Sequence, residues 1–301
     1  MTDAWTAGFK GKRYWRISRL AHAVASLLVI AVAGCATVPL GHDWEQRLRA
    51  DALVLLGEVH DNAAHHQQRL DVLRRVFAAG WRPAIAMEQF DREQQGDIDR
   101  ARVARPGDAQ HVIDLAAPSP GAGRWNWAFY RPFVELALEY DVPLIAVNLS
   151  RADANKVVRG GFAVLFDAGQ MRLLGLDQPV PDALQAAQER EMDNGHCNAL
   201  PQSALPAMAR MQLARDAVMA ALVGKHAAQG VVLIAGNGHV RHDIGVPRWL
   251  SPAQRAKTWT VGYLEQGAAS ARDAAFDTVV RTAAAERTDP CIEFRARREQ
   301  Q

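Results

Sequence analysis

The sequence is poor in cysteine and lacks several motifs that would define a catalytic class. Its 301 residues include 3 cysteines, and 7% are aromatic. No two cysteines have the Cys-x-x-Cys spacing, which excludes common zinc-finger and thioredoxin-like sites. Neither a Gly-x-Ser-x-Gly motif nor a phosphate-binding glycine loop occurs, so the sequence supports neither a serine hydrolase of that type nor nucleotide chemistry.

The N-terminal segment instead has the pattern of a lipoprotein signal peptide. Its basic residues are Lys10, Lys12, Arg13, Arg16 and Arg19. An uncharged, largely apolar stretch follows at residues 20–34, too short for a permanent membrane span. It ends in small residues directly before Cys35, an arrangement that resembles a lipobox. We therefore expect residues 1–34 to be removed and Cys35 to carry acyl chains such as palmitate.

Lipidated Cys35 would anchor the protein to the lipid bilayer, facing the periplasm. Ala36 follows the cysteine, and by resemblance to known sorting rules this favours the outer membrane. The segment before Cys35 holds five basic residues and one acid, out of 35 basic and 33 acidic residues in the chain. The rest therefore has 30 basic and 32 acidic residues, a net charge of about −2, which gives no indication of nucleic-acid binding.

Cys197 and Cys291 are the cysteines that remain after lipidation. In an oxidising compartment they are a candidate disulfide, although two unrelated free thiols are the alternative. Residues 35–301 contain no Gly/Ser linker and no internal repeat, so we expect a single domain with a loose tail at residues 295–301.

Short apolar runs alternate with longer helical patterns, which predicts an α/β fold with a mainly parallel central sheet flanked by helices. The predicted strands are residues 52–56, 84–87, 144–147, 231–235, 258–264 and 278–281. The predicted helices are residues 62–79, with Asp61 or Asn62 as the N-cap, 130–140 and 205–223. Residues 160–202 have no clear pattern.

Polar residues follow the carboxyl ends of four predicted strands, where ligands bind in parallel α/β sheets. They are Glu58, His60, Glu88, Asn148, Asn237 and His239. Taken alone, each residue has a simpler interpretation, as a helix cap or as a hydrogen-bonded residue of a loop. Together they favour a functional site at this edge of the sheet.

Two of these segments share a Gly-x-x-His form, at residues 57–60 and 236–239. Two imidazoles and a carboxylate suit zinc or manganese, so the predicted metal ligands are His60, His239, Glu58 and Glu88. A remaining carboxylate could act as general base, and Asn148 or Arg241 could polarise a substrate carbonyl. This chemistry predicts a metal-dependent hydrolase acting on a peptide or an ester.

The order of these motifs resembles the ChaN-like haem-binding lipoprotein family. The matching segments are residues 57–62 with His65 and His66, 87–95, 125–132, 143–148 and 235–241. The family belongs to the Tiki-type superfamily with the TraB and GumN-like proteins, some of which are similar to metal-dependent peptidases that use paired Gly-x-x-His segments. Erythromycin esterases are related and place acids and histidines at equivalent strand ends.

The resemblance implies haem binding, a role in haem and iron uptake at the outer membrane, and a homodimer bridged by haem. Haem needs an apolar surface, cations near its propionates and usually an axial His or Tyr. The candidates are Tyr130, Trp127 and Arg131, with Arg124 nearby. The alternative for the aromatic residues is that they pack the helix onto the sheet. Haem binding and hydrolysis thus stand as two hypotheses.

Overall fold

The computed structural model describes residue 45 and residues 50–117, 125–289 and 291–292. The predicted signal peptide, the lipidation residue Cys35, Arg124 and the predicted tail at residues 295–301 lie outside this part. In the described part, no helix combines the length and the apolar character needed to cross a membrane.

In the described residues, six parallel strands form one sheet, in the order β3-β2-β4-β1-β5-β6. The strands are β1 (Leu53–Leu56), β2 (Ala84–Asp91), β3 (Leu144–Asn148), β4 (Val231–Ile234), β5 (Thr258–Glu265) and β6 (Thr278–Thr282). The predicted α/β fold is therefore confirmed. The central strands β1 and β4 are buried along their whole length, as expected for a parallel sheet covered on both faces.

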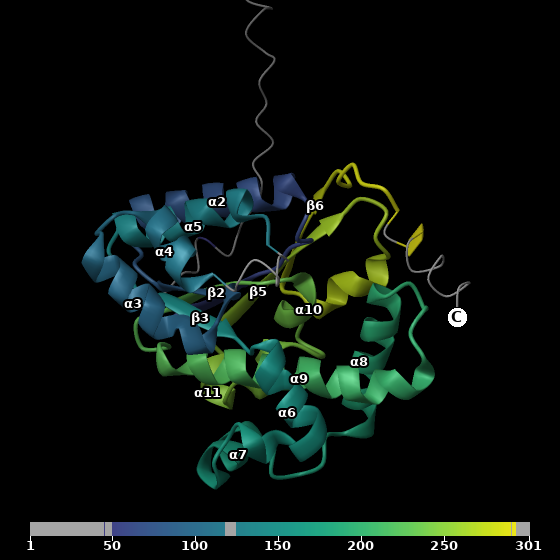
Figure 1. The fold of residues 1–301 in the computed structure, drawn as a ribbon. Helices are drawn as coiled ribbons and strands as arrows, with labels where there is room; N and C mark the ends of the chain where they lie inside the picture. Colours follow the sequence, from purple (N-terminus) through teal and green to yellow (C-terminus); the bar gives the residue numbers. More distant parts are fainter. Residues whose placement is uncertain (1–44, 46–49, 118–124, 290, 293–301) are drawn as a thin grey trace, which may run out of the picture. The chain divides into compact units, whose positions relative to one another are not determined.

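Helices cover the two faces of the sheet (Figure 1). One face packs against α2 (Ala63–Ala78), α3 (Gln95–Ala104), α4 (Ala109–Ala116) and α5 (Trp127–Glu139). The other packs against α6 (Arg151–Gly160), α7 (Ala168–Leu174), α8 (Asp182–Gly195) and α9 (Leu205–Lys225). Two short helices, α10 (Asn237–Val240) and α11 (Pro252–Arg255), follow β4. The 3-10 turns are η2 (Arg92–Gln94), η4 (Phe162–Val164), η5 (Gln202–Ala204), η6 (Val246–Trp249) and η7 (Ser270–Ala275).

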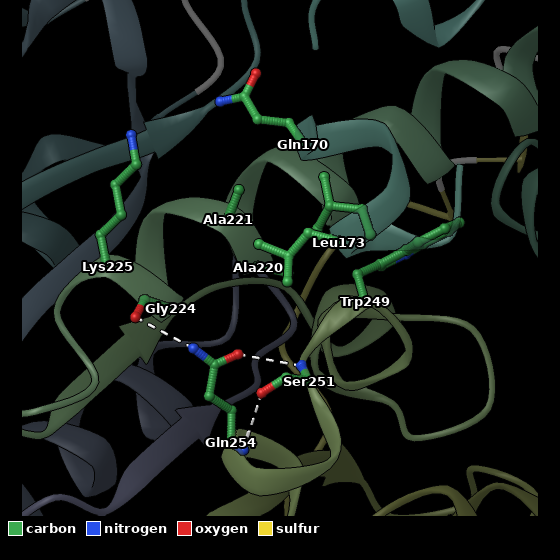
Figure 2. Close-up of a pocket in the computed structure, with 10 residues that line it drawn as sticks. Gln170, Leu173, Ala220, Ala221, Gly224, Lys225, Trp249, Ser251 and Gln254 are labelled. Carbon is green, nitrogen blue, oxygen red and sulfur yellow. Dashed lines mark hydrogen bonds between the residues drawn. The ribbon is translucent and has the colours of Figure 1, made fainter. Parts of the chain in front are cut away.

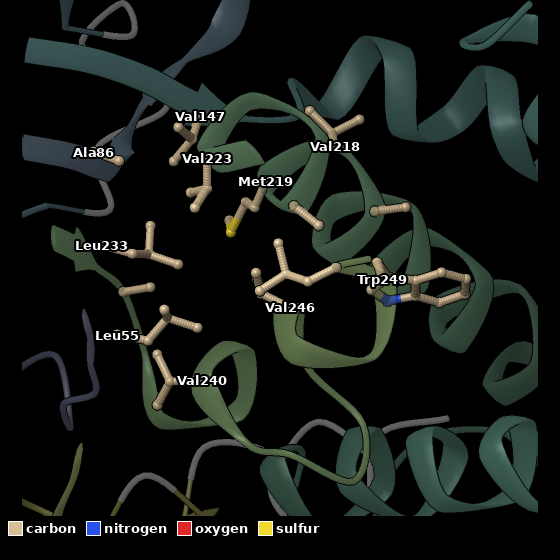
Figure 3. Packing of buried hydrophobic residues seen from close by; sticks show 14 of the residues in the cluster. Leu55, Ala86, Val147, Val218, Met219, Val223, Leu233, Val240, Val246 and Trp249 are labelled. Carbon is tan, nitrogen blue, oxygen red and sulfur yellow. The ribbon is translucent and has the colours of Figure 1, made fainter. Parts of the chain in front are cut away.

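Strand alternation divides the apolar side chains into two cores. In β1, Val54 and Leu56 belong to the core under α2 and α5, whereas Leu53 and Leu55 belong to the core under α9. Figure 3 shows part of the second core, where Leu55 lies near Leu233 of β4 and Val240 of α10, with Met219 and Val223 of α9 above them in the view. Continued past the strand, the same alternation places Glu58, two residues after Leu56, on the side of α2 and α5.

The structure extends the sequence prediction in two places. Strand β2 continues to Asp91, with an irregular register after Met87, so Glu88 lies within the strand rather than after it. Residues 160–202, which had no clear pattern, form η4, α7, α8 and the start of η5. Of the two proposed caps of α2, Asn62 is the one used: its side chain accepts hydrogen bonds from the backbone of the first turn.

A disulfide joins Cys197 and Cys291, with their Cα atoms 5.5 Å apart. It connects the residues after α8 to the C-terminal segment that follows β6. The cross-link closes a loop across 94 positions of the sequence and so restricts the unfolded chain.

Candidate functional site

Glu58 follows β1 and is the centre of a buried polar cluster on the α2 and α5 side of the sheet. Its Oε1 accepts hydrogen bonds from the Tyr130 hydroxyl (2.5 Å) and from Nδ1 of His60 (2.6 Å). Its Oε2 accepts one from the guanidinium of Arg69 on α2. Three donors thus satisfy a carboxylate that is only 2% exposed.

Arg69 is fully buried beneath this carboxylate. Its Nη1 also donates to the Leu56 carbonyl oxygen (3.3 Å), and the guanidinium lies 5.3 Å from the centre of the Phe133 ring. Burial lowers the pKa of Arg69 to about 10, so the side chain stays charged at neutral pH. Arg69 and Glu58 are therefore an ion pair in which loss of either partner would leave a buried, uncompensated charge.

His66 positions the segment that carries His60. Its Nε2 donates to the backbone carbonyl of His60 (2.9 Å), and its Nδ1 accepts from Arg69 (2.9 Å). The ring stacks on Phe129 at 4.5 Å between centroids. Burial lowers the pKa of His66 to about 4, so the ring is neutral in this arrangement at neutral pH.

A second buried cluster lies on the α9 side of the sheet. Glu88 accepts a hydrogen bond from the backbone amide of Gly236 (2.8 Å), and its other oxygen is 3.4 Å from Nε2 of His239. Nδ1 of His239 donates to Asp216 of α9 at 2.5 Å. The side-chain amide of Gln212, one turn earlier in α9, lies 3.0 Å from Nε2 of His239.

The two carboxylates hold His239 in its charged form. Burial opposes the charge, but Glu88 and Asp216 outweigh burial and raise the pKa of His239 to about 10. Burial also opposes ionisation of Glu88, yet the imidazolium lowers the pKa of Glu88 well below its usual range. Burial raises the pKa of Asp216 to about 6 despite the adjacent imidazolium. At neutral pH the cluster therefore holds two anions and one cation.

The two Gly-x-x-His segments interlock at the carboxyl edge of the sheet. A Cβ on Gly236 would lie 2.9 Å from Cε1 of His60, so the His60 ring reaches over this position only because it is glycine. A Cβ on Gly57 would lie 2.2 Å from the side-chain oxygen of Asn237. That oxygen accepts from the backbone amide of Tyr263 on β5 (3.1 Å). Each glycine thus makes room for a side chain of the other segment.

Two residues with predicted roles in catalysis have other partners. Asn148 donates through its side-chain amide to Asp91 (2.9 Å), at the ends of β3 and β2. Arg241 binds Glu191 of α8 (2.9 Å) and Asp243 (2.7 Å). The structure therefore brings Glu58, Glu88, His60 and His239 to the site and directs Arg241 to a partly buried ion-pair network.

The predicted zinc or manganese site is not supported. Within the described ranges, no group of three or more His, Cys, Asp and Glu side chains is arranged to hold a metal ion. Glu58 is bound by Tyr130 and Arg69, whereas Glu88 is bound by His239 and the Gly236 amide, so each carboxylate already has protein partners of its own. The guanidinium of Arg69, bound to Glu58, would also repel a cation there.

An aromatic surface lies beside the exposed edge of the first cluster. The His60 side chain is 47% exposed and meets the partly buried Trp125 edge-on at 4.8 Å. The predicted haem residue Trp127 is partly buried and packs on Phe90 at 5.0 Å. This surface offers an exposed imidazole next to aromatic rings, which are the kinds of group that haem contacts in proteins.

The other two predicted haem residues are placed differently. Tyr130 has no exposed surface, and its hydroxyl donates to Glu58, so it would have to leave this position to contact a ligand. Burial raises the pKa of Tyr130, which keeps the hydroxyl protonated. Arg131 is exposed and pairs with Glu135 one turn along α5 (2.8 Å).

Arg69 and Asp216 are site residues that the sequence prediction missed. Both have a signal in the sequence, because each is a charged residue on the apolar stripe of its helix. Arg69 shares this stripe with Leu73 and Val76, and Asp216 lies between Leu213 and Ala220 on the buried side of α9. A charge at such a position indicates a buried partner.

The fold and the site define an α/β protein with a ligand site at the carboxyl edge of a parallel sheet. The family described as "Haem-binding uptake, Tiki superfamily, ChaN" matches residues 44–250. The chain therefore belongs to this ChaN family, as its motifs predict.

Solved structures with this fold include ChaN of Campylobacter jejuni, described as "Cofacial heme binding to ChaN". It is 20% identical, with a TM-score of 0.60, and the match covers 79% of this chain and 89% of that chain. An erythromycin esterase mutant in its open conformation is 14% identical with a TM-score of 0.42, covering 81% of this chain and 79% of that one. The type III effector HopBA1 is 11% identical with a TM-score of 0.40, covering 78% and 90%. The last two scores are too low to bear on function, and no curated protein matches the chain.

Proposed function

We propose that this protein binds haem at the aromatic surface around His60 and serves haem or iron uptake. The observation that carries the proposal is the family match over residues 44–250 together with the exposed imidazole of His60 at the mouth of the site. The C. jejuni ChaN structure, whose description names haem, has the same fold and supports the proposal.

The residues that would hold haem are those on the exposed side of the first cluster. Trp125 and Trp127 offer apolar contact, and Arg131 is an exposed cation for a propionate if its pair with Glu135 opens. His60 donates through Nδ1 to Glu58, which orients the ring and makes Nε2 the nitrogen suited to binding iron. Bound haem would supply the iron-centred redox and ligand chemistry.

A haem titration followed by absorption spectroscopy tests this proposal. We expect saturable binding in the purified chain and a loss of affinity of about tenfold or more in His60→Ala. His226→Ala is the matched control, because His226 is a partly exposed histidine that follows the last turn of α9, away from the carboxyl edge of the sheet. Equal affinity in His60→Ala and the control would reject His60, and a wild type without saturable binding would reject haem binding itself.

Membrane anchoring and a haem-bridged homodimer are further parts of the proposal. The disulfide between Cys197 and Cys291 supports export, because such bonds persist in oxidising compartments. Cys35→Ser should move the protein out of the membrane fraction or leave the signal peptide attached. Sedimentation with and without haem tests the dimer: a haem-dependent doubling of mass supports it, and an unchanged mass rejects it.

A second candidate is a hydrolase that acts without a metal on an ester or a peptide. The observation that favours it is the buried cluster around His239, which haem binding at the surface does not require. His60, oriented by Glu58, could accept a proton from an attacking water, and the imidazolium of His239 could stabilise the developing oxyanion.

Chromogenic p-nitrophenyl esters of increasing acyl length, and a peptide library, test this candidate. We expect turnover that His60→Ala and His239→Gln each reduce by about 10²-fold or more, with His226→Ala unchanged. Turnover that survives in both site variants would reject the hydrolase, whatever the haem titration shows.

A further inference from the structure

A pocket of about 300 Å³ lies away from the site at the carboxyl edge, between α7, the last turns of α9 and the segment from Trp249 to Gln254. Figure 2 shows the side chains of Ala220, Ala221 and Leu173 in the middle of the view, with Lys225 on one side and Trp249 on the other. At about 30 Å³ for each water-sized group, the pocket holds roughly ten non-hydrogen atoms.

The walls of the pocket are mainly apolar. Leu173, Leu174, Ala220 and Ala221 provide aliphatic surface, and the indole of Trp249 provides aromatic surface. Leu173 is 75% exposed on α7, which is unusual for a leucine next to an apolar pocket. An apolar ligand in the pocket would cover part of this side chain.

The charged side chain that lines the pocket is a donor, Lys225. No acidic residue lines it, and Lys225 forms no ion pair within the described ranges. Gln170 uses its side-chain oxygen to accept from the Asp167 amide, which leaves the NH₂ group. The buried indole nitrogen of Trp249 has no hydrogen-bond partner in the described part of the chain.

The polar groups of Gln254 are already satisfied within the protein. Its oxygen accepts from the Ser251 amide (3.1 Å), and its NH₂ group donates to the Gly224 carbonyl (3.2 Å), as the dashed lines in Figure 2 show. These bonds fix the lower wall of the pocket, and among the described residues no carboxylate lines it that would favour a cationic ligand.

We propose that this pocket binds an alkyl carboxylate of about eight to ten carbons, a medium-chain fatty acid. The aliphatic chain lies against Leu173, Ala220 and Ala221, and the carboxylate lies at the rim near the ammonium of Lys225. The apolar walls select the chain, and the absence of acids together with the lysine selects the anionic head.

Equilibrium dialysis of the purified full-length chain with labelled octanoate, octanol and butyrate tests the proposal. We expect saturable octanoate binding with one molecule per chain. Butyrate should bind at least about tenfold more weakly, because each buried methylene increases affinity by up to about fourfold (about 0.8 kcal/mol). Octanol should bind about two- to fivefold more weakly, because it lacks the charge that an exposed lysine can pair with.

Two variants locate the binding. Ala221→Leu fills the pocket and should weaken octanoate binding by about tenfold or more, whereas Ala253→Leu on α11 adds the same group at an exposed position outside the pocket. Lys225→Met should weaken octanoate by about two- to fivefold and leave octanol unchanged, whereas Arg74→Met on α2 should change neither.

The affinities of the variants for octanoate decide whether the pocket is the binding site. Loss of octanoate binding in Ala221→Leu, with Ala253→Leu like the wild type, supports the pocket. No saturable octanoate binding, or equal affinity in Ala221→Leu and the wild type, overturns it. If Ala221→Leu does not fold, Lys225→Met decides: equal weakening of octanoate and octanol, or no change in either, overturns the proposal.

Discussion

The two polar clusters at the carboxyl edge of the sheet are built from the same kind of segment but differ in charge. The Glu58 cluster pairs one carboxylate with one guanidinium, and a tyrosine and two histidines complete its hydrogen bonds. The His239 cluster sets one imidazole between two carboxylates. At neutral pH the arginine is charged in the folded and the unfolded chain alike, whereas the imidazole gains its charge on folding, because folding raises the pKa of His239 from 6.5 to about 10.

Their different surroundings explain this contrast. Glu58 is covered by α2 and α5, and its cation is an arginine, whose pKa of about 10 in the folded state keeps it charged at neutral pH. Glu88 is paired with His239, which Asp216 of α9 also binds, and a histidine can lose its charge. The comparison indicates a structural role for the first cluster beneath His60, and a role in proton binding for the second.

Removing the arginine should produce the largest effect. Arg69→Met leaves Glu58 buried without its cation, so we expect the free energy of unfolding to fall by about 3–5 kcal/mol. Urea unfolding measures it, with Arg74→Met, an exposed arginine on the same helix, as a control that changes little. A loss below about 1 kcal/mol would show that the ion pair does not hold this face of the sheet together.

The second cluster should make stability depend on pH. The pKa of His239 rises from 6.5 to about 10 on folding, so the folded state binds more protons than the unfolded state between these values. The stabilisation is complete below pH 6.5 and is lost as the pH rises through 10. From pH 7 to 9.5 we expect the wild type to lose about 1–3 kcal/mol more than His239→Gln, measured by urea unfolding. Parallel pH profiles would contradict this assignment.

A methyl group at the contact between the two segments should have an intermediate effect. Gly236→Ala places a Cβ within 3.1 Å of two His60 ring atoms, so the ring must move or the strand end must shift. We expect a loss of stability of about 1–3 kcal/mol and a changed NMR signal of His60. Gly238→Ala is the matched control, because no atom lies within 4 Å of its added Cβ. If both variants behave alike, the two segments do not depend on this contact.

The smallest effect is expected outside both clusters. Arg241→Gln breaks partly exposed ion pairs with Glu191 and Asp243, so its stability should change by about 1 kcal/mol or less. Haem affinity and ester turnover should stay as in the wild type. A large loss of either would show that Arg241 moves into the site and takes the catalytic role that its sequence position predicts.

Much of the sheet could be predicted from the sequence because buried parallel strands are short runs of Val, Leu and Ile. Residues 52–56 and 231–235 therefore locate β1 and β4 within one residue at either end. The end of β2 could not be predicted, because the irregular register after Met87 depends on pairing with β3. The region of α7 and α8 was missed because its helices bury few residues and so have a weak apolar stripe.

The sequence by itself determined the class of fold, the family and the identity of four residues that reach the site: Glu58, His60, Glu88 and His239. Local hydrophobic patterns and short motifs carry that information. Only the tertiary structure decided how these residues are grouped. The direction of a side chain on a strand and the charged partner on a distant helix, Arg69 or Asp216, depend on packing across the sheet. That packing placed Glu58 in an ion pair with Arg69.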